Sequence, residues 1–191
     1  MKELYKLNDI ELIEGIKQGH KAWFSILVDR YQSAVAGIII GMLGRIPEAD
    51  DVGQEVFIRF YNAIDQYKGE SSLKTYLGRI AINLSLNELA RQKKQNSRYS
   101  AIEGAQAFAS SDNVSQREES AEWVEKGLAL LDTPFRQVLV LRLIEGFSVK
   151  ETAEIMDIPM GTVLSRQNSA QKKLKEILLK LDAHNGSKYT K

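Results

Sequence analysis

The sequence predicts an all-α protein made of two small helical domains joined by a flexible linker. Apolar residues recur at helical spacing within residues 1–96 and again within residues 119–182. Leu, Ala, Glu, Lys and Ile are plentiful, whereas the 191 residues contain only three prolines. Residues 97–118 are rich in Ser, Ala, Gln and Asn, which is typical of a linker. Residues 183–191 are polar and are expected to form a disordered tail.

The first predicted helix begins at a capping box. Asn8 and Glu11 are three residues apart, so each side chain can bond to the other residue's backbone N–H, and Gly19 can end the helix. A second helix is expected over residues 21–43, where aromatic and aliphatic residues are frequent.

The next two helices follow from a proline and an apolar stripe. Pro47 can start a helix whose first turn carries acidic residues, which the helix dipole favours. After the loop "DQYKGESS", apolar residues at helical spacing predict a fourth helix over residues 72–94.

Three helices are expected in the second block. Thr133 as a cap, followed by Pro134, starts the first, and Gly146 ends it. Ser148 and Glu151 form another capping box, and Pro159 opens the last helix.

Two short helices separated by a tight turn fit a helix-turn-helix. Small Ala153 lets the helices approach, Ile158 fills the turn and Val163 anchors the second helix. The start of that helix would then offer three side chains to the major groove, Thr162, Ser165 and Arg166. A generic helical hairpin has the same periodicity.

Composition excludes several classes of protein. The chain has no cysteine, and its two histidines are far apart in sequence, so a metal site is not expected. The acids of "EADDVGQE" occupy more than one helix face, which argues against a metal-bound or two-carboxylate hydrolytic centre. No phosphate-binding loop or nucleophile elbow occurs, so neither an enzyme nor a cofactor is predicted.

Hydropathy and charge bear on location and partners. The longest apolar run, residues 35–43, spans about nine residues, well below the ~20 that cross a bilayer, and no secretory signal is recognised. We therefore expect a cytoplasmic protein without membrane insertion. The net charge of +1 means that any DNA binding depends on local patches.

Aromatic and amide side chains gather around the loop and the fourth helix of the first block. Aromatic rings stack on unpaired bases, and asparagine amides bond to base edges. The candidates are Tyr67, Tyr76, Arg79, Asn83 and Asn87. The residues alone favour a simpler interpretation, in which Tyr76 is a core ring and Asn83 a solvated polar residue.

Two stretches of the first block and one of the second resemble a known family. "ADDVGQEVFIRFYNAIDQYKG" and "SLKTYLGRIAINLSLNELARQKK" resemble region 2 of bacterial RNA polymerase sigma factors. "LLDTPFRQVLVLRLIEGFSVKETAEIMDIPMGTVLSR" resembles region 4. The length and the lack of other regions are similar to the extracytoplasmic-function (ECF) subgroup of the sigma-70 family. The resemblance implies that residues 1–96 are region 2 and residues 119–182 are region 4.

The resemblance implies three binding surfaces. One faces the clamp helices of the largest subunit of core RNA polymerase and comprises Asp50, Asp51, Gln54, Glu55, Phe57, Arg59 and Phe60. A second holds the melted, single-stranded −10 element and comprises Gln66, Tyr67, Lys68, Gly69, Ser71, Ser72, Lys74, Tyr76, Arg79, Asn83 and Asn87. A third reads the duplex −35 element and comprises Ser148, Thr162, Leu164, Ser165, Arg166, Asn168 and Lys172.

Further partners are implied by the resemblance. Region 4 would also touch the polymerase flap, and relatives are commonly held inactive by an anti-sigma factor that covers both domains. A loose tether between the domains would permit such clamping and release.

The sequence departs from the family at several positions. Leu73, Lys74, Thr75 and Tyr76 stand where relatives often carry Phe-Ser-Thr-Trp. Leu164 replaces a usual basic residue, and two positions that are often arginine are Ser169 and Gln171. The loss of phosphate contacts should weaken binding and flatten its salt dependence, while Leu164 is suited to an apolar feature such as a thymine methyl.

Two other functions compete with the sigma-factor interpretation. A conventional helix-turn-helix regulator would act as a dimer without polymerase, but no heptad seam or ligand pocket is evident. A helical interaction protein that has lost DNA binding would also fit the neutral substitutions in the recognition helix.

Overall fold

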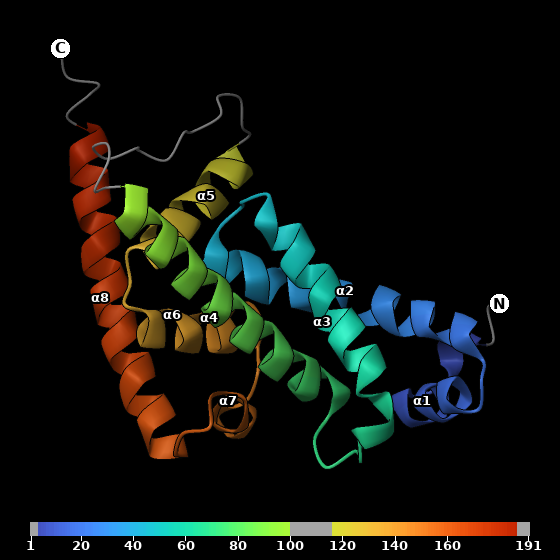
Figure 1. Cartoon of the computed structure of the whole chain (residues 1–191). Helices are drawn as coiled ribbons and strands as arrows, with labels where there is room; N and C mark the ends of the chain where they lie inside the picture. Colours follow the sequence, from blue (N-terminus) through green and yellow to red (C-terminus); the bar gives the residue numbers. More distant parts are fainter. Residues whose placement is uncertain (1–3, 100–115, 187–191) are drawn as a thin grey trace.

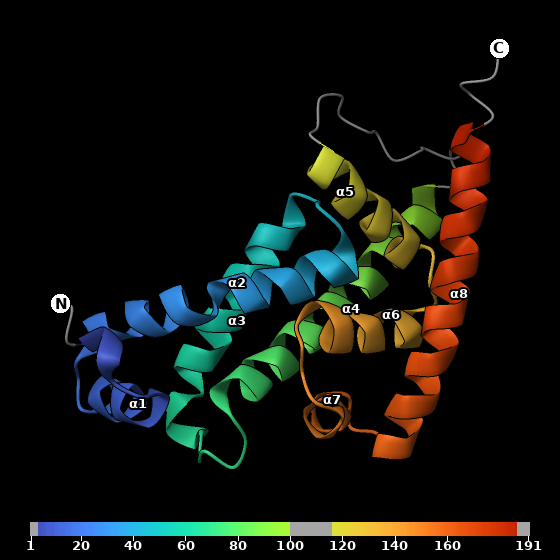
Figure 2. The same ribbon diagram turned by 180° about the vertical axis from the view of Figure 1, so that it is seen from behind.

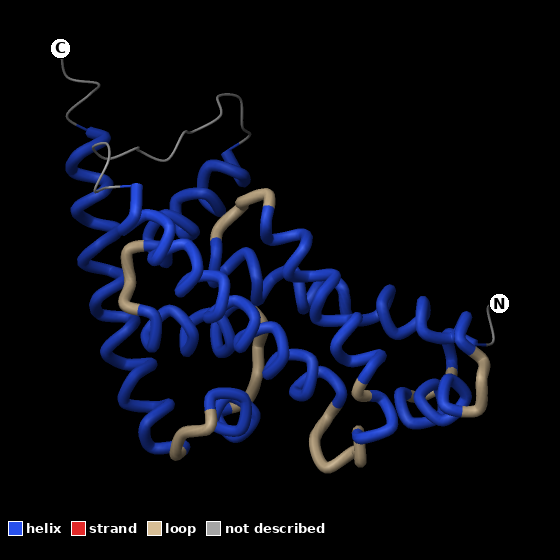
Figure 3. Tube along the Cα trace, in the orientation of Figure 1, coloured by secondary structure: helices blue, strands red, loops and turns tan. Residues whose placement is uncertain are grey.

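The computed structural model describes residues 4–99 and 116–186, with side chains for 4–97 and 122–182. Every regular element in these ranges is helical, as Figure 3 shows. The all-α prediction is confirmed. The middle of the predicted linker, residues 100–115, and the end of the predicted tail, residues 187–191, lie outside the described residues.

The first unit, residues 4–99, is built around three helices. Helices α2 (Phe24–Leu43), α3 (Glu48–Asn62) and α4 (Leu73–Tyr99) pack on one another, and α1 (Asp9–Lys17) closes one end (Figure 1). Short 3-10 turns connect them: η1 (Leu4–Lys6), η2 (Lys21–Trp23) and η3 (Ile64–Gln66).

Helix ends in the first unit follow from local chemistry. The Asn8 side chain accepts from Glu11 N–H while the Glu11 carboxylate accepts from Asn8 N–H, so the predicted capping box is confirmed. Gly19 follows α1 with a φ of +103°, which side chains other than glycine's rarely adopt. Pro47 stands at the N-cap of α3, one residue before the acidic first turn.

The second unit, residues 116–186, carries a long helix with shorter ones against it. The elements are α5 (Gln116–Ala129), α6 (Thr133–Leu139), the π-helix η4 (Val140–Ile144), α7 (Val149–Met156) and α8 (Met160–Gly186). Figure 2 shows α8 running along one side of the molecule, with α6 and α5 beside it.

Three details of the second unit differ from the prediction. Helix α5 was not anticipated, although Leu128 is buried on it. The N-cap of α6 is Asp132, so Thr133 already lies within the helix and Pro134 follows in its first turn. Helix α8 continues to Gly186, four residues beyond the predicted domain end at 182.

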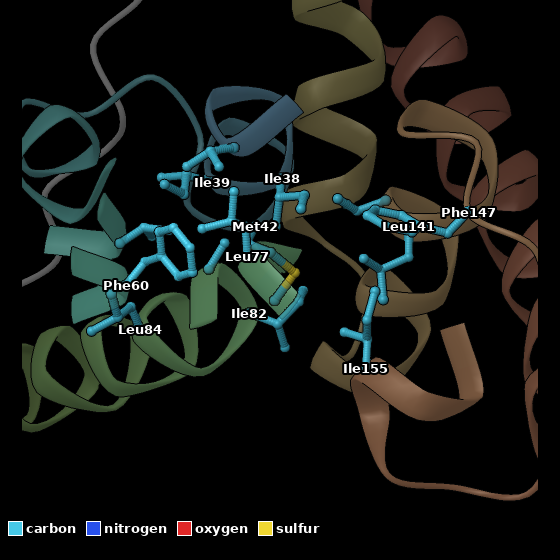
Figure 4. Close-up of a cluster of buried hydrophobic side chains, with 14 of the residues drawn as sticks. Ile38, Ile39, Met42, Phe60, Leu77, Ile82, Leu84, Leu141, Phe147 and Ile155 are labelled. Atoms are coloured by element: carbon cyan, nitrogen blue, oxygen red, sulfur yellow. The ribbon is translucent and has the colours of Figure 1, made fainter. Parts of the chain in front are cut away.

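The two units are packed against each other. One cluster of buried side chains contains Ile38 and Met42 of α2 together with Leu141, Phe147 and Ile155 of the second unit. Figure 4 shows these side chains meeting from both units. Hydrophobic periodicity predicts which face of a helix is buried but not which element buries it, so this shared core could not be predicted from the sequence.

One segment also has the length and composition of a membrane span. Residues Lys21–Leu43 have a mean hydropathy of 1.4, so the apolar segment is longer than the uninterrupted run of residues 35–43. Ile38, Ile39 and Met42, on the buried face of α2, lie in the hydrophobic core, which is the ordinary place of such a helix in a folded bundle.

Candidate polymerase and promoter DNA interfaces

The helix-turn-helix consists of α7, a tight turn and the start of α8. Ser148 and Glu151 form the predicted capping box at the start of α7. Val138 of α6, Ala153 and Val163 form a small buried cluster, against which Ile158 packs. The predicted roles of Ala153, Ile158 and Val163 as packing residues are confirmed.

The turn itself depends on the backbone conformation of Asp157. Asp157 ends α7 with a φ of +53° and a ψ of +50°, and the N–H of this residue donates to the Ala153 carbonyl. Aspartate tolerates this left-handed conformation better than most residues do, because its short side chain can bond locally. The left-handed residue reverses the chain and lets α8 start at Met160.

The first two turns of α8 expose an unusual surface. Met160 and Leu164 are 55% and 50% exposed, whereas Val163 between them is fully buried. The Ser165 hydroxyl donates to the Thr162 carbonyl at 3.1 Å. Of the remaining expected −35 side chains, Thr162 and Arg166 are half-buried. The others are exposed, namely Ser148, Asn168 and Lys172. All expected −35 residues therefore lie on α8 or at the N-cap of α7.

A cluster of aromatic rings supports the loop before α4. The Tyr67 and Tyr76 rings meet edge to face with centroids 5.2 Å apart, and Phe60 lies 5.9 Å from Tyr76. Tyr67 and Tyr76 are only half-buried, so each ring keeps an exposed part. Burial, with Asp9 and Tyr76 nearby, raises the pKa of the Tyr67 phenol, which therefore stays a neutral donor.

Hydrogen bonds fix the loop on this aromatic support. The Tyr67 hydroxyl donates to the Ser71 carbonyl at 2.7 Å, and Lys17 Nζ donates to the Tyr67 carbonyl at 3.4 Å. The Ser72 and Thr75 hydroxyls are 2.9 Å apart at the start of α4. Gln66, Lys68 and Gly69 stay exposed at the loop's tip, and Gly69 has a φ of +72°.

The expected −10 residues on α4 fall into two groups. Asn83 and Asn87 are exposed and one helical turn apart, so their amides are available to a nucleic acid strand. Lys74 and Arg79 are engaged instead by the second unit. Lys74 Nζ donates to the Glu145 carbonyl at 2.7 Å, and the Arg79 guanidinium donates to the Glu154 carbonyl.

The expected polymerase-binding residues lie on α3. Asp50, Asp51 and Gln54 are exposed, Phe57 is half-buried, and Glu55 pairs with Arg59 at 2.8 Å. Phe60 differs from the expectation. Its ring is fully buried against other aromatic rings, so it cannot touch a partner in this conformation.

An additional apolar side chain on α3 was missed by the sequence reasoning. Ile58 is 52% exposed and lies next to Phe57 and Arg59 along the helix. The available signal was its position outside the apolar stripe that contains Val52, Val56 and Phe60. Among the described residues no group of three or more His, Asp or Glu side chains converges as a metal site would.

Comparisons with known proteins agree with this division into a helical bundle and a helix-turn-helix unit, the form of a transcription initiation factor. The family description "Sigma-70 region 2" matches residues 27–95, and "Sigma-70, region 4" matches residues 127–176. The RNA polymerase sigma-H factor of Pseudomonas aeruginosa is 34% identical over 168 residues, covering 83% of this chain and 87% of that protein. The ECF RNA polymerase sigma-E factor of Escherichia coli K12 is 36% identical over 174 residues, covering 84% and 89%.

Solved structures are similar as well. CnrH in complex with the cytosolic domain of CnrY superposes with a TM-score of 0.68 at 27% identity, covering 92% of this chain and 97% of that one. The sigma factor RpoE of Bartonella quintana, in complex with the anti-sigma factor NepR, has a TM-score of 0.68 at 22% identity, covering 83% and 98%, and supports the fold. The chain belongs to the sigma-70 family of bacterial RNA polymerase sigma factors, in the ECF subgroup.

Proposed function

We propose that this sigma factor divides promoter-specific initiation among three surfaces: α3 for core polymerase, the 66–72 loop with α4 for the −10 strand, and the start of α8 for the −35 duplex. The observation that carries the proposal is the half-exposed Tyr67–Tyr76 pair beside the exposed amides of Asn83 and Asn87. Helical periodicity places Tyr76, Asn83 and Asn87 on one face of α4, and such rings and amides suit an unpaired strand better than a duplex.

Polymerase binding is assigned to the exposed side of α3. The carboxylates of Asp50 and Asp51 are exposed and suit a basic partner surface, and Phe57 and Ile58 add apolar contact area. Phe60 is left out of the binding set, because it serves the core.

Capture of a −10 base is assigned to the loop over the aromatic cluster. Extruding a base costs a few kcal/mol, and stacking returns about 1–3 kcal/mol per base. Binding of polymerase and of the −35 element makes this capture effectively intramolecular, so the free protein need not melt DNA. The net charge of +1 is compatible with this, since the polymerase supplies further phosphate contacts.

The −35 duplex is assigned to the helix-turn-helix. It offers the half-buried Arg166 and the exposed Lys172 for phosphates or bases, and the exposed Leu164 for a thymine methyl. The proposed partners also include the polymerase flap and an anti-sigma factor, because the similar proteins CnrH and RpoE were each solved with a bound partner, which for RpoE is the anti-sigma factor NepR. The proposed location is the cytoplasm and the proposed role is non-catalytic.

Run-off transcription with reconstituted core polymerase and genomic fragments tests the proposal and identifies the promoter. Specific transcripts should appear only with the sigma factor present. Asn83→Ala and Arg166→Ala should each reduce initiation at that promoter. The matched controls Gln32→Ala and Lys180→Ala change exposed residues outside the three surfaces and should not reduce initiation. The proposal fails if no promoter-directed transcript appears, or if the two pairs of variants behave alike.

A further inference from the structure

Two large apolar side chains protrude from the first two turns of α8. Met160 and Leu164 are 55% and 50% exposed, although α8 buries Val163 and Ala170 completely on its inner side. Both protruding side chains belong to the part of α8 to which the proposed function assigns the −35 duplex. Water disfavours exposed apolar surface, so a partner that covers these two side chains gains free energy.

Small residues stand beside the two apolar side chains. Gly161 has no side chain, and a Cβ built on it would have open space around it. Ser165 is short, and its hydroxyl already donates to the Thr162 carbonyl at 3.1 Å. Met160 and Leu164 are therefore accessible to a partner that approaches the start of α8.

The helix start that carries the pair is held rigidly. The N–H groups of Thr162 and Val163 donate to the Pro159 carbonyl at 2.9 and 3.2 Å, and the Val163 side chain is fully buried. Side chains on such a rigid element meet a partner at a fixed spacing. Residues four apart on a helix have Cβ atoms about 5–6 Å apart. This separation lies between one and two base-pair steps of ~3.4 Å.

The major groove of DNA offers one apolar feature. Guanine, adenine and cytosine present hydrogen-bonding groups there, whereas thymine adds a C5 methyl group beside its O4. An apolar side chain over the other bases removes water from their polar groups without replacing the lost hydrogen bonds, which is unfavourable. Over a thymine methyl, the same side chain buries apolar area on both partners. An apolar pair in the groove therefore favours thymine and disfavours the other bases.

The charges near the pair favour DNA over a protein partner. Residues 158–175 contain no acidic residue and four basic ones. The exposed Lys172 and the half-buried Arg166 lie within this stretch. Basic side chains suit the phosphate backbone that borders the groove, while the apolar pair suits the base edges inside it.

We propose, on the basis of the proposed function, that Met160 and Leu164 recognise the methyl groups of two thymines that lie within three consecutive base pairs of the −35 element. The proposal adds Met160 to the −35 surface and names the chemical feature of the DNA that this surface selects. Leu164 stands where relatives usually carry a basic residue, so an apolar contact replaces an electrostatic one at this position. Recognition of the two methyl groups is then independent of salt.

Replacement of thymine by uracil tests the proposal at the level of single methyl groups. The probe is the promoter identified by run-off transcription, in which each −35 thymine is replaced in turn by 2′-deoxyuridine, which lacks only the methyl group. Binding of the reconstituted holoenzyme should fall about four-fold at two positions within three base pairs, as expected for one buried methyl group each, and stay unchanged at the others. At a sensitive position, 5-methylcytosine should bind about four-fold better than cytosine. The absence of such a pair of positions would overturn the proposal.

Protein variants assign each methyl group to a side chain. Met160→Ala should abolish the sensitivity to one uracil, and Leu164→Ala the sensitivity to the other. Both side chains are exposed, so neither variant should lose helical circular dichroism. Leu179→Ala shortens a leucine that is 59% exposed farther along α8, and this matched control should keep both sensitivities. The salt dependence of binding should be the same in all three variants, because none of them loses a charge. If either Met160→Ala or Leu164→Ala keeps both sensitivities, the proposal is overturned.

Further outcomes separate this inference from the proposed function. If Arg166→Ala weakens promoter binding but no uracil does, α8 still contacts the −35 element and recognition of methyl groups is wrong. If Met160→Ala and Leu164→Ala weaken binding to core polymerase and leave both uracil sensitivities intact, a protein surface covers the pair and the proposal is wrong. If the wild-type holoenzyme binds no promoter specifically, the proposed function fails and this inference fails with it.

Discussion

The Arg136 guanidinium of α6 donates a 2.7 Å hydrogen bond to the main-chain oxygen of Met42, in the last turn of α2. The same side chain donates to the carbonyls of Ala129 and Leu131. A cation at a helix C-terminus is favoured by the helix dipole, and here it also joins the two units. Burial lowers the pKa of Arg136, although the group remains charged at any physiological pH.

Replacing this arginine should cost more than replacing an arginine in a surface ion pair. In Arg136→Met, three carbonyls lose a charged donor, so we expect the free energy of unfolding to fall by about 2–3 kcal/mol. Arg45→Ala removes the exposed pair with Glu125 and should cost about 0–1 kcal/mol. Urea denaturation followed by circular dichroism measures both. Equal losses in the two variants would show that the Arg136–Met42 contact stabilises the fold no more than a surface ion pair does.

Glu145 should make the stability depend on pH. Burial raises the pKa of its carboxyl above the usual value, and Lys74 opposes this rise. The folded protein then binds the proton more tightly than the unfolded chain does, so this group lowers stability as pH rises from the usual glutamate range through its raised pKa. Glu145→Gln should therefore be more stable than the wild type near pH 7, with the gap closing on acidification. The exposed Glu70→Gln is the control, and a gap that widens in acid would contradict the assignment.

Much of the fold could be predicted because its signals are local. Capping boxes at Asn8 and Ser148 and packing residues such as Val163 depend on neighbours within a few residues. The packing of the two units against each other could not be predicted. The close approach at Gly41 and Gly78 is recognisable only when the opposing side chains are known. Helix α5 was missed since its start falls in a stretch whose composition resembles a linker.

The location of the candidate site could be predicted from the sequence, but the burial of one of its expected residues could not. The family motifs placed Tyr76, Asn83 and the start of α8 on surfaces that are at least partly exposed. They could not show that Phe60 is enclosed by rings from Phe24, Tyr67 and Tyr76, because burial of one aromatic among several depends on tertiary packing.

Ser148 should stabilise the folded protein even in the absence of DNA. Its hydroxyl accepts from Glu151 N–H at 3.2 Å, and Ser148→Ala should lower the free energy of unfolding by about 1 kcal/mol. Ser165→Ala, which removes a hydroxyl bonded within its own helix, should change it by less than about 0.5 kcal/mol. Thermal or urea unfolding of the two variants decides the matter. A larger loss from Ser165 would mean that the cap is not stabilising α7.

Leu164 offers a gain-of-function test of −35 binding. The side chain is 50% exposed at the start of α8, so Leu164→Arg should fit without disturbing the buried Val163. One added phosphate contact should steepen the dependence of log affinity on log salt by about one unit. Holoenzyme binding to the identified promoter, titrated in salt, measures the slope, with Leu179→Arg on the far part of α8 as control. An unchanged slope for Leu164→Arg would mean that this face of α8 lies away from the DNA backbone.

Tyr76 should contribute to promoter opening through its ring and not through its hydroxyl. The ring lies 5.2 Å from Tyr67 and 5.9 Å from Phe60, and its half-buried position leaves part of it for a base. Tyr76→Ala should lower open-complex formation about 5- to 150-fold, the equivalent of the 1–3 kcal/mol that base stacking provides, and Tyr76→Phe should retain nearly full activity. Permanganate reactivity of −10 thymines reports opening, while binding to core polymerase checks that α3 is intact. Equal defects in the Ala and Phe variants would show that the hydroxyl, and not stacking, supports opening.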